Sequence, residues 1–225
     1  MPAALSPAAA LTAIDAIQQH FAWRLAQKRE TSALAAELAS VLSLLEDVDF
    51  ACPDAAHLHA TRHPVITQIK GLAAARTDNA ILAAFLPHLD VLPWRYSYDA
   101  RADHPGLETR MAWAELVGPV APFKSQRVCL GLTAIGAHTL YPAHTHPAVE
   151  TYLVLSGSAR WTMNEHARTH PPGTLILHPS NVVHAMQTDT SPLLAAYAWT
   201  GDVKTLSRYL GRDAPDANAE VSSRL

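Results

Sequence analysis

Short apolar runs, bounded by glycine and proline, occupy the chain from residue 126 to about 202. The runs read VCLGLTAIG, ETYLVLSG, SARWTM, GTLILHP and LLAAYAWTG. Each run has the length of one strand, and the Gly and Pro residues between the runs are typical of turns. No helical periodicity interrupts this region. The spacing of short strands and turns predicts a small β-barrel or sandwich.

The first ninety residues have a different pattern, in which apolar residues recur at helical spacing. Residues 8–28 form one such stretch, Thr31 and Ser32 are placed to cap a second, and residues 65–87 form a third that is broken near Thr77 and Asp78. Asp78 is the expected cap of the last helical turns. No Gly/Ser linker follows these helices, so we expect them to share one core with the barrel.

These patterns divide the chain into three parts. We predict a helical N-terminal region packed on the barrel over 1–91 and a β-barrel over 92–202. A short helix at about 202–211 and a polar tail complete 203–225. Within the barrel, 92–125 is rich in proline and aromatic residues, which is typical of irregular or edge-strand structure.

Charge and cysteine content exclude several classes of function. The 225 residues carry a formal charge of -3, so no basic face for nucleic acid or anionic lipid is expected. No run of about 18 uncharged apolar residues is present, which argues against a membrane span. Cys52 and Cys129 lack CxxC spacing, and the N-terminus has no basic segment typical of a signal peptide. These features predict a mature cytoplasmic protein.

The stretch YPAHTHPAVETY, residues 141–152, concentrates the polar chemistry of the barrel region. His144 and His146 are two residues apart, and so are Glu150 and Tyr152, so in extended chain each pair shares a face. Pro147 separates the pairs, which predicts two short strands folded against each other. Imidazole and carboxylate groups bind divalent first-row ions, and such groups buried without a metal would be costly. We therefore predict a metal site here.

A further histidine would complete a mixed His/Glu site. The downstream histidines available for this are His166, His170, His178 and His184. His178 precedes a proline, and His184 follows a Pro-Ser-Asn turn that leads into a strand. Local chemistry does not choose between these two.

Two motifs resemble the cupin signature. The pattern H-x-H-x3-E-x6-G, from His144 to Gly157, is similar to the first cupin motif, and GTLILHPSNVVH at 173–184 is similar to the second. The resemblance implies that His144, His146, Glu150 and His184 are the metal ligands and that His178 is a residue of the pocket wall. Gly136 departs from the motif, because it stands further ahead of His144 than is usual.

A narrower resemblance links the chain to the bacterial cupin-type dimethylsulfoniopropionate (DMSP) lyases. It rests on Tyr141, on Tyr152 followed by LVLSG, and on the spacing from His146 to His184. It implies a mainly β, double-stranded β-helix fold preceded by helices, and one divalent metal: zinc, iron, manganese, nickel or cobalt. It further implies that a tyrosine removes a proton from the carbon beside the substrate carboxylate, releasing dimethyl sulfide and acrylate. We expect Tyr152 to be that base and Tyr141 to assist it or bind substrate.

The chemistry of such a reaction predicts the rest of the site. A tyrosine with a pKa of about 10 needs a nearby metal ion to become a base near neutral pH. A cationic sulfonium is attracted to aromatic faces, for which Tyr197 and Trp199 with Trp94 or Tyr96 are available. The expected partner is a small carboxylate, and a homodimer is left open. The alternatives are another metal-dependent cupin enzyme, such as a dioxygenase, an isomerase or a lyase of a different small carboxylate, or a non-enzymatic small-molecule-binding cupin.

Overall fold

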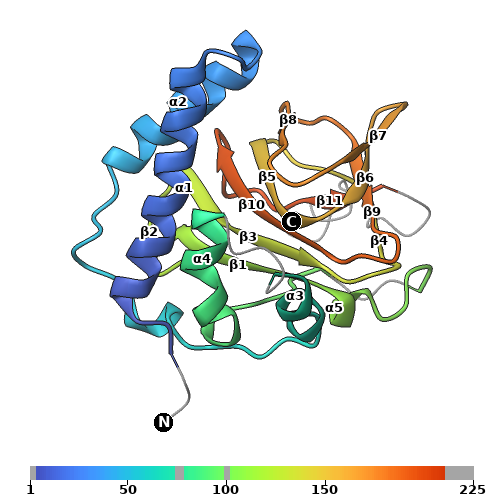
Figure 1. The fold of residues 1–225 in the computed structure, drawn as a ribbon, viewed down its shortest axis with the longest axis horizontal. Helices are drawn as coiled ribbons and strands as arrows, with labels where there is room; N and C mark the ends of the chain where they lie inside the picture. The colour runs from blue at the N-terminus through green and yellow to red at the C-terminus, as the bar shows by residue number, and fades with distance from the viewer. Residues whose placement is uncertain (1–3, 74–78, 99–101, 211–225) are drawn as a thin grey trace, which may run out of the picture.

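The computed structural model describes residues 4–73, 79–98 and 102–210 (Figure 1). The helices are α1 Pro7–Gln27, α2 Ser32–Glu46, η1 Ala55–His57, α3 Val65–Ala73, α4 Ala80–Phe85, η2 Leu86–Val91 and α5 Leu107–Arg110. The strands are β1 Met111–Gly118, β2 Phe123–Lys124, β3 Val128–Ile135, β4 Leu140–Thr145, β5 Val149–Gly157, β6 Ala159–Met163, β7 His166–His170, β8 Leu175–His178, β9 His184–Gln187, β10 Leu193–Thr200 and β11 Arg208–Tyr209.

Side-chain caps set where the long helices begin. The Ser6 hydroxyl accepts a hydrogen bond from the Ala9 N–H at the start of α1, and Thr31 caps α2 through the Leu34 N–H. Both helices start where the sequence predicts. Asn79 caps α4 by accepting from two backbone N–H groups, whereas Asp78, the expected cap, lies outside the described residues.

The strands form two sheets. The first has six strands in the order β2-β1-β3-β10-β5-β8, and the second has five in the order β11-β4-β9-β6-β7. The helical N-terminal region covers one side of the six-stranded sheet, and the five-stranded sheet lies beyond its other side (Figure 1). This mainly β, cupin-type double-stranded β-helix with a helical N-terminal region confirms the predicted fold class.

Side chains alternate across the six-stranded sheet and give it two buried faces. On β3 and β10, Leu130, Leu132, Leu194 and Ala196 pack with buried residues of the helices in one continuous cluster. Neighbouring positions such as Cys129 and Tyr197 belong to a second cluster, inside the barrel. Burial on both faces explains why these strands read as unbroken apolar runs. The predicted boundaries of the three parts of the chain, after residues 91 and 202, stay a prediction.

Two expectations from the sequence are wrong. The predicted short helix at about 202–211 is absent from its described part, 202–210, where β11 pairs instead with β4. The pairs His144/His146 and Glu150/Tyr152 do not come from strands folded against each other, because β4 and β5 lie in different sheets. The turn around Pro147 carries the chain from one sheet to the other, so the two pairs meet across the barrel interior.

Candidate metal centre

A bulge in β4 brings Tyr141 and His144 to the same side of the strand. The register of β4 against β9 shifts between these two residues, which would otherwise point to opposite faces because they are three apart. Their rings stack with centroids 3.9 Å apart, and both residues are buried. The bulge therefore places a phenol directly beside an imidazole in the barrel interior.

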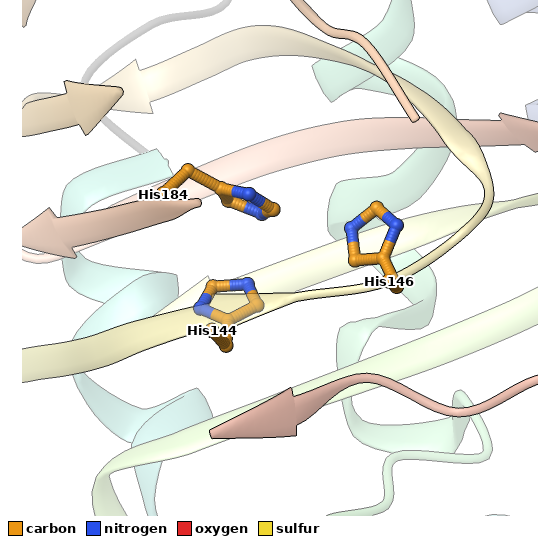
Figure 2. Close-up of side chains that lie close together, drawn as sticks. All are labelled: His144, His146 and His184. Carbon is orange, nitrogen blue, oxygen red and sulfur yellow. The ribbon is translucent and has the colours of Figure 1, made fainter. Parts of the chain in front are cut away.

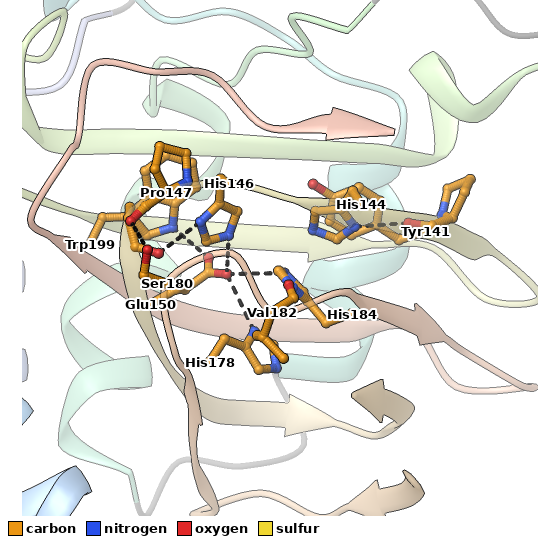
Figure 3. Close-up of polar contacts among 12 residues, drawn as sticks. Tyr141, His144, His146, Pro147, Glu150, His178, Ser180, Val182, His184 and Trp199 are labelled. Atoms are coloured by element: carbon orange, nitrogen blue, oxygen red, sulfur yellow. Dashed lines mark hydrogen bonds and ion pairs between the residues drawn. The ribbon is translucent and has the colours of Figure 1, made fainter. Parts of the chain in front are cut away.

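Four histidines and one glutamate gather in this interior. His144 and His146 come from β4 and the turn after it, and His184 opens β9; ring nitrogens of these three lie within 4.8 Å of one another (Figure 2). Glu150 joins them from β5 across the barrel, and His178 comes from the neighbouring β8. Glu150 Oε2 is 3.0 Å from His146 Nε2 and 3.4 Å from His184 Nε2 (Figure 3).

The donor set of this cluster fits a divalent metal ion. The Nδ1 atoms of His144, His146 and His184 lie 2.8, 3.0 and 3.0 Å from backbone carbonyl oxygens. As Nδ1–H donors to those carbonyls, the rings present Nε2 lone pairs to the common space, an arrangement typical of metal-ligating histidine. His184 Nε2 is buried and has no partner in hydrogen-bond geometry, although Glu150 lies close to it. A buried His/Glu cluster compatible with a metal site is thus established.

Ionisation in the cluster also suits a cation. Burial, together with the neighbouring His184, holds the pKa of His144 well below its usual value, so the ring is a neutral donor. Burial alone would raise the pKa of Glu150, but the charge and hydrogen bond of His146 outweigh burial and hold that pKa well below its usual value. His144 is therefore neutral and Glu150 ionised, as metal binding requires, while at His146 burial is outweighed by Glu150, which raises the pKa of a ring whose proton a bound metal ion would displace.

His178, which the sequence suggested as a residue of the pocket wall, lies in direct contact with the cluster. Its Nδ1 is 3.5 Å from Glu150 Oε2, and its ring centroid is 4.0 Å from that of His184 (Figure 3). Burial lowers the pKa of His178 to about 4, so the ring is neutral. Together with Glu150 and His184, His178 forms a second set of three close ligand atoms.

Trp199 holds Glu150 in place. Its indole Nε1–H donates to Glu150 Oε1 over 2.7 Å, and its ring stacks on His146 with centroids 4.3 Å apart. Trp199 on β10 is directly opposite Glu150 on β5. The sequence suggested Trp199 as an aromatic residue of the pocket wall. The structure adds that Trp199 binds Oε1 of Glu150, so that Oε2 faces the histidines.

Tyr152 is buried on the inner face of β5, two residues after Glu150. Burial raises the pKa of its phenol well above the ordinary value, the negative charge of Glu150 adds to this, and a hydrogen bond with Thr133 opposes it. The second phenol, Tyr141, has its pKa raised well above the ordinary value, first by burial, and its hydroxyl makes a short hydrogen bond with that of Tyr98. Both phenols are protonated in these surroundings.

A cavity of about 780 Å³ adjoins the cluster. Of the residues predicted to form the site, those that line this cavity are Tyr141, His144, His146, Glu150, Tyr152, Tyr197 and Trp199. Trp94 is instead part of the core beneath the helices, where its indole N–H donates to the Leu89 carbonyl. Tyr96 packs behind the lining residue Trp113, with ring centroids 5.9 Å apart. His178 and His184 lie behind the described lining, within the cluster.

Several lining residues carry no motif in the sequence. Tyr98, Trp113, Glu115 and Arg95 all face the cavity from the aromatic-rich segment and β1. The sequence drew attention to the aromatic content of this segment but not to Glu115, which sits in the apolar run MAWAELVG. A lone charged residue at an inward-facing position of a buried strand is the signal that could have identified it.

No described helix is long and apolar enough to cross a membrane.

Residues 36–195 match the model of the dimethylsulfoniopropionate lyase family. A putative DMSP lyase, DddL of Cereibacter sphaeroides, is 36% identical over 119 residues, which are 52% of this chain and 49% of that protein. The DMSP lyase DddQ of Ruegeria pomeroyi is 35% identical over 127 residues, 56% of this chain and 63% of that protein. The aligned residues thus span only about half to three fifths of these curated relatives.

Solved structures show the same likeness in three dimensions. The crystal structure of DMSP lyase DddQ from Ruegeria pomeroyi superposes with a TM-score of 0.65 and 28% identity, covering 87% of this chain and 96% of that one. A chain from the crystal structures of the DMSP lyases RdDddP and RnDddQII superposes with a TM-score of 0.73 and 25% identity, covering 92% and 100%.

Proposed function

Because the chain belongs to the dimethylsulfoniopropionate lyase family, we propose that it is a metal-dependent carbon–sulfur lyase that splits DMSP into dimethyl sulfide and acrylate. The observation that carries this proposal is the position of Tyr152. Its phenol lies on the wall of the cavity beside a buried His/Glu cluster, where one substrate can meet both.

The proposed ligands are His144, His146, Glu150 and His184. Their support is the neutral state of His144, the hydrogen bonds that orient the three Nδ1 atoms, and the unpartnered Nε2 of His184. Four ligands of this kind accept zinc, iron, manganese, nickel or cobalt. When bound, the ion supplies positive charge that makes the C–H beside a bound carboxylate more acidic and stabilises a nearby phenolate.

Tyr152 is the proposed base. As the phenolate that a bound metal ion would stabilise, its oxygen takes the proton from the carbon beside the carboxylate, the electron pair of that C–H bond forms the new C=C bond, and the C–S pair leaves with sulfur. The products are acrylate, neutral dimethyl sulfide and one proton held on Tyr152. Tyr141 is the proposed assistant, since its hydroxyl faces the same cavity and is held by Tyr98.

Aromatic side chains supply the proposed surroundings of the sulfonium. Tyr197 and Trp199 share the inner face of β10, and Trp113 and Tyr98 add further rings to the cavity wall. Aromatic faces attract cations and exclude water from the site of reaction. Trp94 and Tyr96 are not part of this proposal, because they lie outside the described lining.

The size of the cavity favours a second candidate function. At about 780 Å³ it is near the upper end of ordinary ligand sites, which run from about 300 to 1,000 Å³. A cavity of this size also admits a larger β-substituted carboxylate, on which the same base and metal cluster would act as a lyase.

We place the protein in the cytoplasm, a proposal supported by two free cysteines, Cys52 and Cys129.

The proposal is tested by supplying DMSP to purified, metal-reconstituted protein with oxygen excluded. We expect acrylate and dimethyl sulfide in equal amounts, and loss of both when the metal is removed by a chelator. Consumption of DMSP that requires oxygen and yields an oxygenated product would contradict the lyase in favour of a dioxygenase. Trace turnover with every candidate metal would identify the substrate as a different carboxylate.

A further inference from the structure

Glu115 is a buried carboxylate on the cavity wall that takes no part in the metal cluster. It lies on β1, is 9% exposed, and faces the same cavity as Tyr152. Among the described residues lining that cavity, Glu150 is the other carboxylate, and the histidines and Trp199 already contact both of its oxygens. A buried charge of this kind is costly unless it has partners or a ligand.

Strand register puts Glu115 in one row with the proposed base. Glu115 is opposite Gly131, Gly131 is opposite Tyr197, and Tyr197 is opposite Tyr152, so the row crosses β1, β3, β10 and β5. Side chains in one such row point to the same face of a sheet. Glu115, Tyr197 and Tyr152 therefore face the barrel interior side by side.

The missing side chain of Gly131 lets Tyr197 reach Glu115. A Cβ at Gly131 would lie 3.0 Å from Tyr197 Cε1, so the tyrosine ring passes over the glycine. The Tyr197 hydroxyl then donates to Glu115 Oε2 over 3.3 Å. This contact orients the carboxylate and connects it with the aromatic wall.

Arg95 pairs with one oxygen of Glu115 and is the more exposed of the two partners. Arg95 Nη2 is 3.1 Å from Glu115 Oε1, but the arginine side chain is 33% exposed, whereas that of the glutamate is 10% exposed. Water screens the guanidinium more strongly than the buried carboxylate. Burial raises the pKa of Glu115, while Arg95 opposes the rise and favours the ionised form. Cys129 is a third partner of the carboxylate, through a side-chain hydrogen bond, and an ionised carboxylate accepts more hydrogen bonds and contacts than these three partners make.

We propose that Glu115, together with the ring of Tyr197, forms a subsite for the positively charged group of the substrate, a sulfonium or quaternary ammonium carried a few atoms from a carboxylate. This inference rests on the proposed function, in which the carboxylate end lies at the metal cluster. Tyr152 lies at the end of the row next to the metal cluster, two residues after Glu150 on β5, so a carboxylate held at the cluster brings its neighbouring carbon near the phenol.

If Glu115 binds the cationic group, its substitution should change KM and not lower kcat. The attraction to Glu115 exists while sulfur is positive and disappears when neutral dimethyl sulfide forms. An interaction that is stronger in the ground state than in the transition state lowers KM without raising kcat. Glu115→Gln should therefore raise KM for DMSP about tenfold or more while kcat stays the same or increases.

The direct test compares two unreactive ligands of the same shape. One is 3-(trimethylammonio)propanoate, and the other is 4,4-dimethylpentanoate, in which a neutral carbon replaces the nitrogen. Calorimetric titration of the metal-loaded wild type should give a dissociation constant at least tenfold lower for the cation. In Glu115→Gln the two constants should become nearly equal, whereas Glu115→Asp, which keeps the charge, should retain most of the preference.

Controls separate this subsite from general effects. Glu46→Gln removes a charge from an exposed position at the end of α2 and should leave the preference unchanged. If Glu115→Gln does not fold, Glu115→Met fills a similar volume without charge and repeats the comparison. An undiminished preference for the cation in the folded, uncharged variant would overturn the proposal.

The outcome also separates this inference from the proposed reaction. If the wild type prefers the cation through Glu115 but releases no dimethyl sulfide from DMSP, the subsite stands and the reaction is wrong. If the wild type cleaves DMSP and Glu115→Gln keeps both KM and the ligand preference, the reaction stands and the subsite is wrong.

Discussion

Tyr152 on β5 and Tyr197 on β10 lie directly opposite each other on the inner face of the six-stranded sheet. Tyr152 adjoins the metal cluster, and Tyr197 reaches over Gly131 to Glu115. The two phenols thereby connect the two buried carboxylates of the cavity wall. The reach of Tyr197 depends on close strand packing at Gly131, which is a point where the arrangement can be tested.

Gly131→Ala should destabilise the protein and disturb this row. The added Cβ would lie 2.3 Å from the Ala114 carbonyl oxygen and 2.9 Å from Glu115 Cα, so the backbones of β1 and β3 must separate. Overpacking of this kind costs about 1–3 kcal/mol, which we expect to see as a lower midpoint in chemical denaturation.

Gly71→Ala is the matched control for that substitution. Gly71 lies within α3 with nothing near its Cβ position, so alanine should be neutral or should stabilise by about 0.5–1 kcal/mol through helix propensity. Equal stability of the two variants would contradict the packing described for Gly131.

Trp199→Phe should weaken metal binding while the fold persists. The substitution keeps an aromatic ring against His146 but removes the N–H that donates to Glu150 Oε1. Loss of a hydrogen bond to a buried charged group corresponds to a reduction in metal affinity of about 10- to 100-fold. Competition with a chromophoric chelator measures this, and an unchanged affinity would show that Trp199 does not position the ligand.

His184→Ala and His178→Ala should have unequal effects on metal content. His184 Nε2 lies within reach of both His144/His146 and Glu150, whereas His178 contacts Glu150 through Nδ1 at 3.5 Å. Elemental analysis after reconstitution should find little metal in the His184 variant and most of it retained in the His178 variant. The reverse pattern would reassign the fourth ligand to His178.

Gly157→Ala should be far more damaging than Gly173→Ala. Both glycines have left-handed backbone, with φ of +74° and +87°, but a Cβ at Gly157 would lie 1.8 Å from the Pro192 carbonyl oxygen while Gly173 faces open space. Holding an alanine in the left-handed backbone conformation alone costs about 1–2 kcal/mol. We expect about that loss at Gly173 and at least about 3 kcal/mol at Gly157. Similar unfolding midpoints for the two variants would refute this difference.

Much of the fold could be predicted because its signals are local. The apolar runs at β3, β5, β8 and β10 have strand length and turn residues at their ends, and the caps of α1 and α2 precede clear helical periodicity. β7 could not be predicted, since HARTH is polar except for Ala167 and becomes a strand only by pairing with β6. The same holds for β11, a two-residue strand that is defined by its partner β4.

The site shows the same division between local motifs and long-range contacts. The spacing of His144, His146, Glu150 and Tyr152 was readable because all four lie in one short segment. The hydrogen bond from Trp199 to Glu150 and the row from Tyr152 to Glu115 depend on strand register, which brings distant residues together. The side-chain period of strands predicts which residues share a face, but not which strands become neighbours.

Headspace detection of dimethyl sulfide shows whether Tyr152 is the base of a metal-dependent elimination. Metal-reconstituted wild type and Tyr152→Phe are given DMSP with oxygen excluded, and the metal content of both is measured. We expect rapid release by the wild type, and a loss of at least about 100-fold in Tyr152→Phe at equal metal content. Full-rate release by the Phe variant would contradict the role of Tyr152.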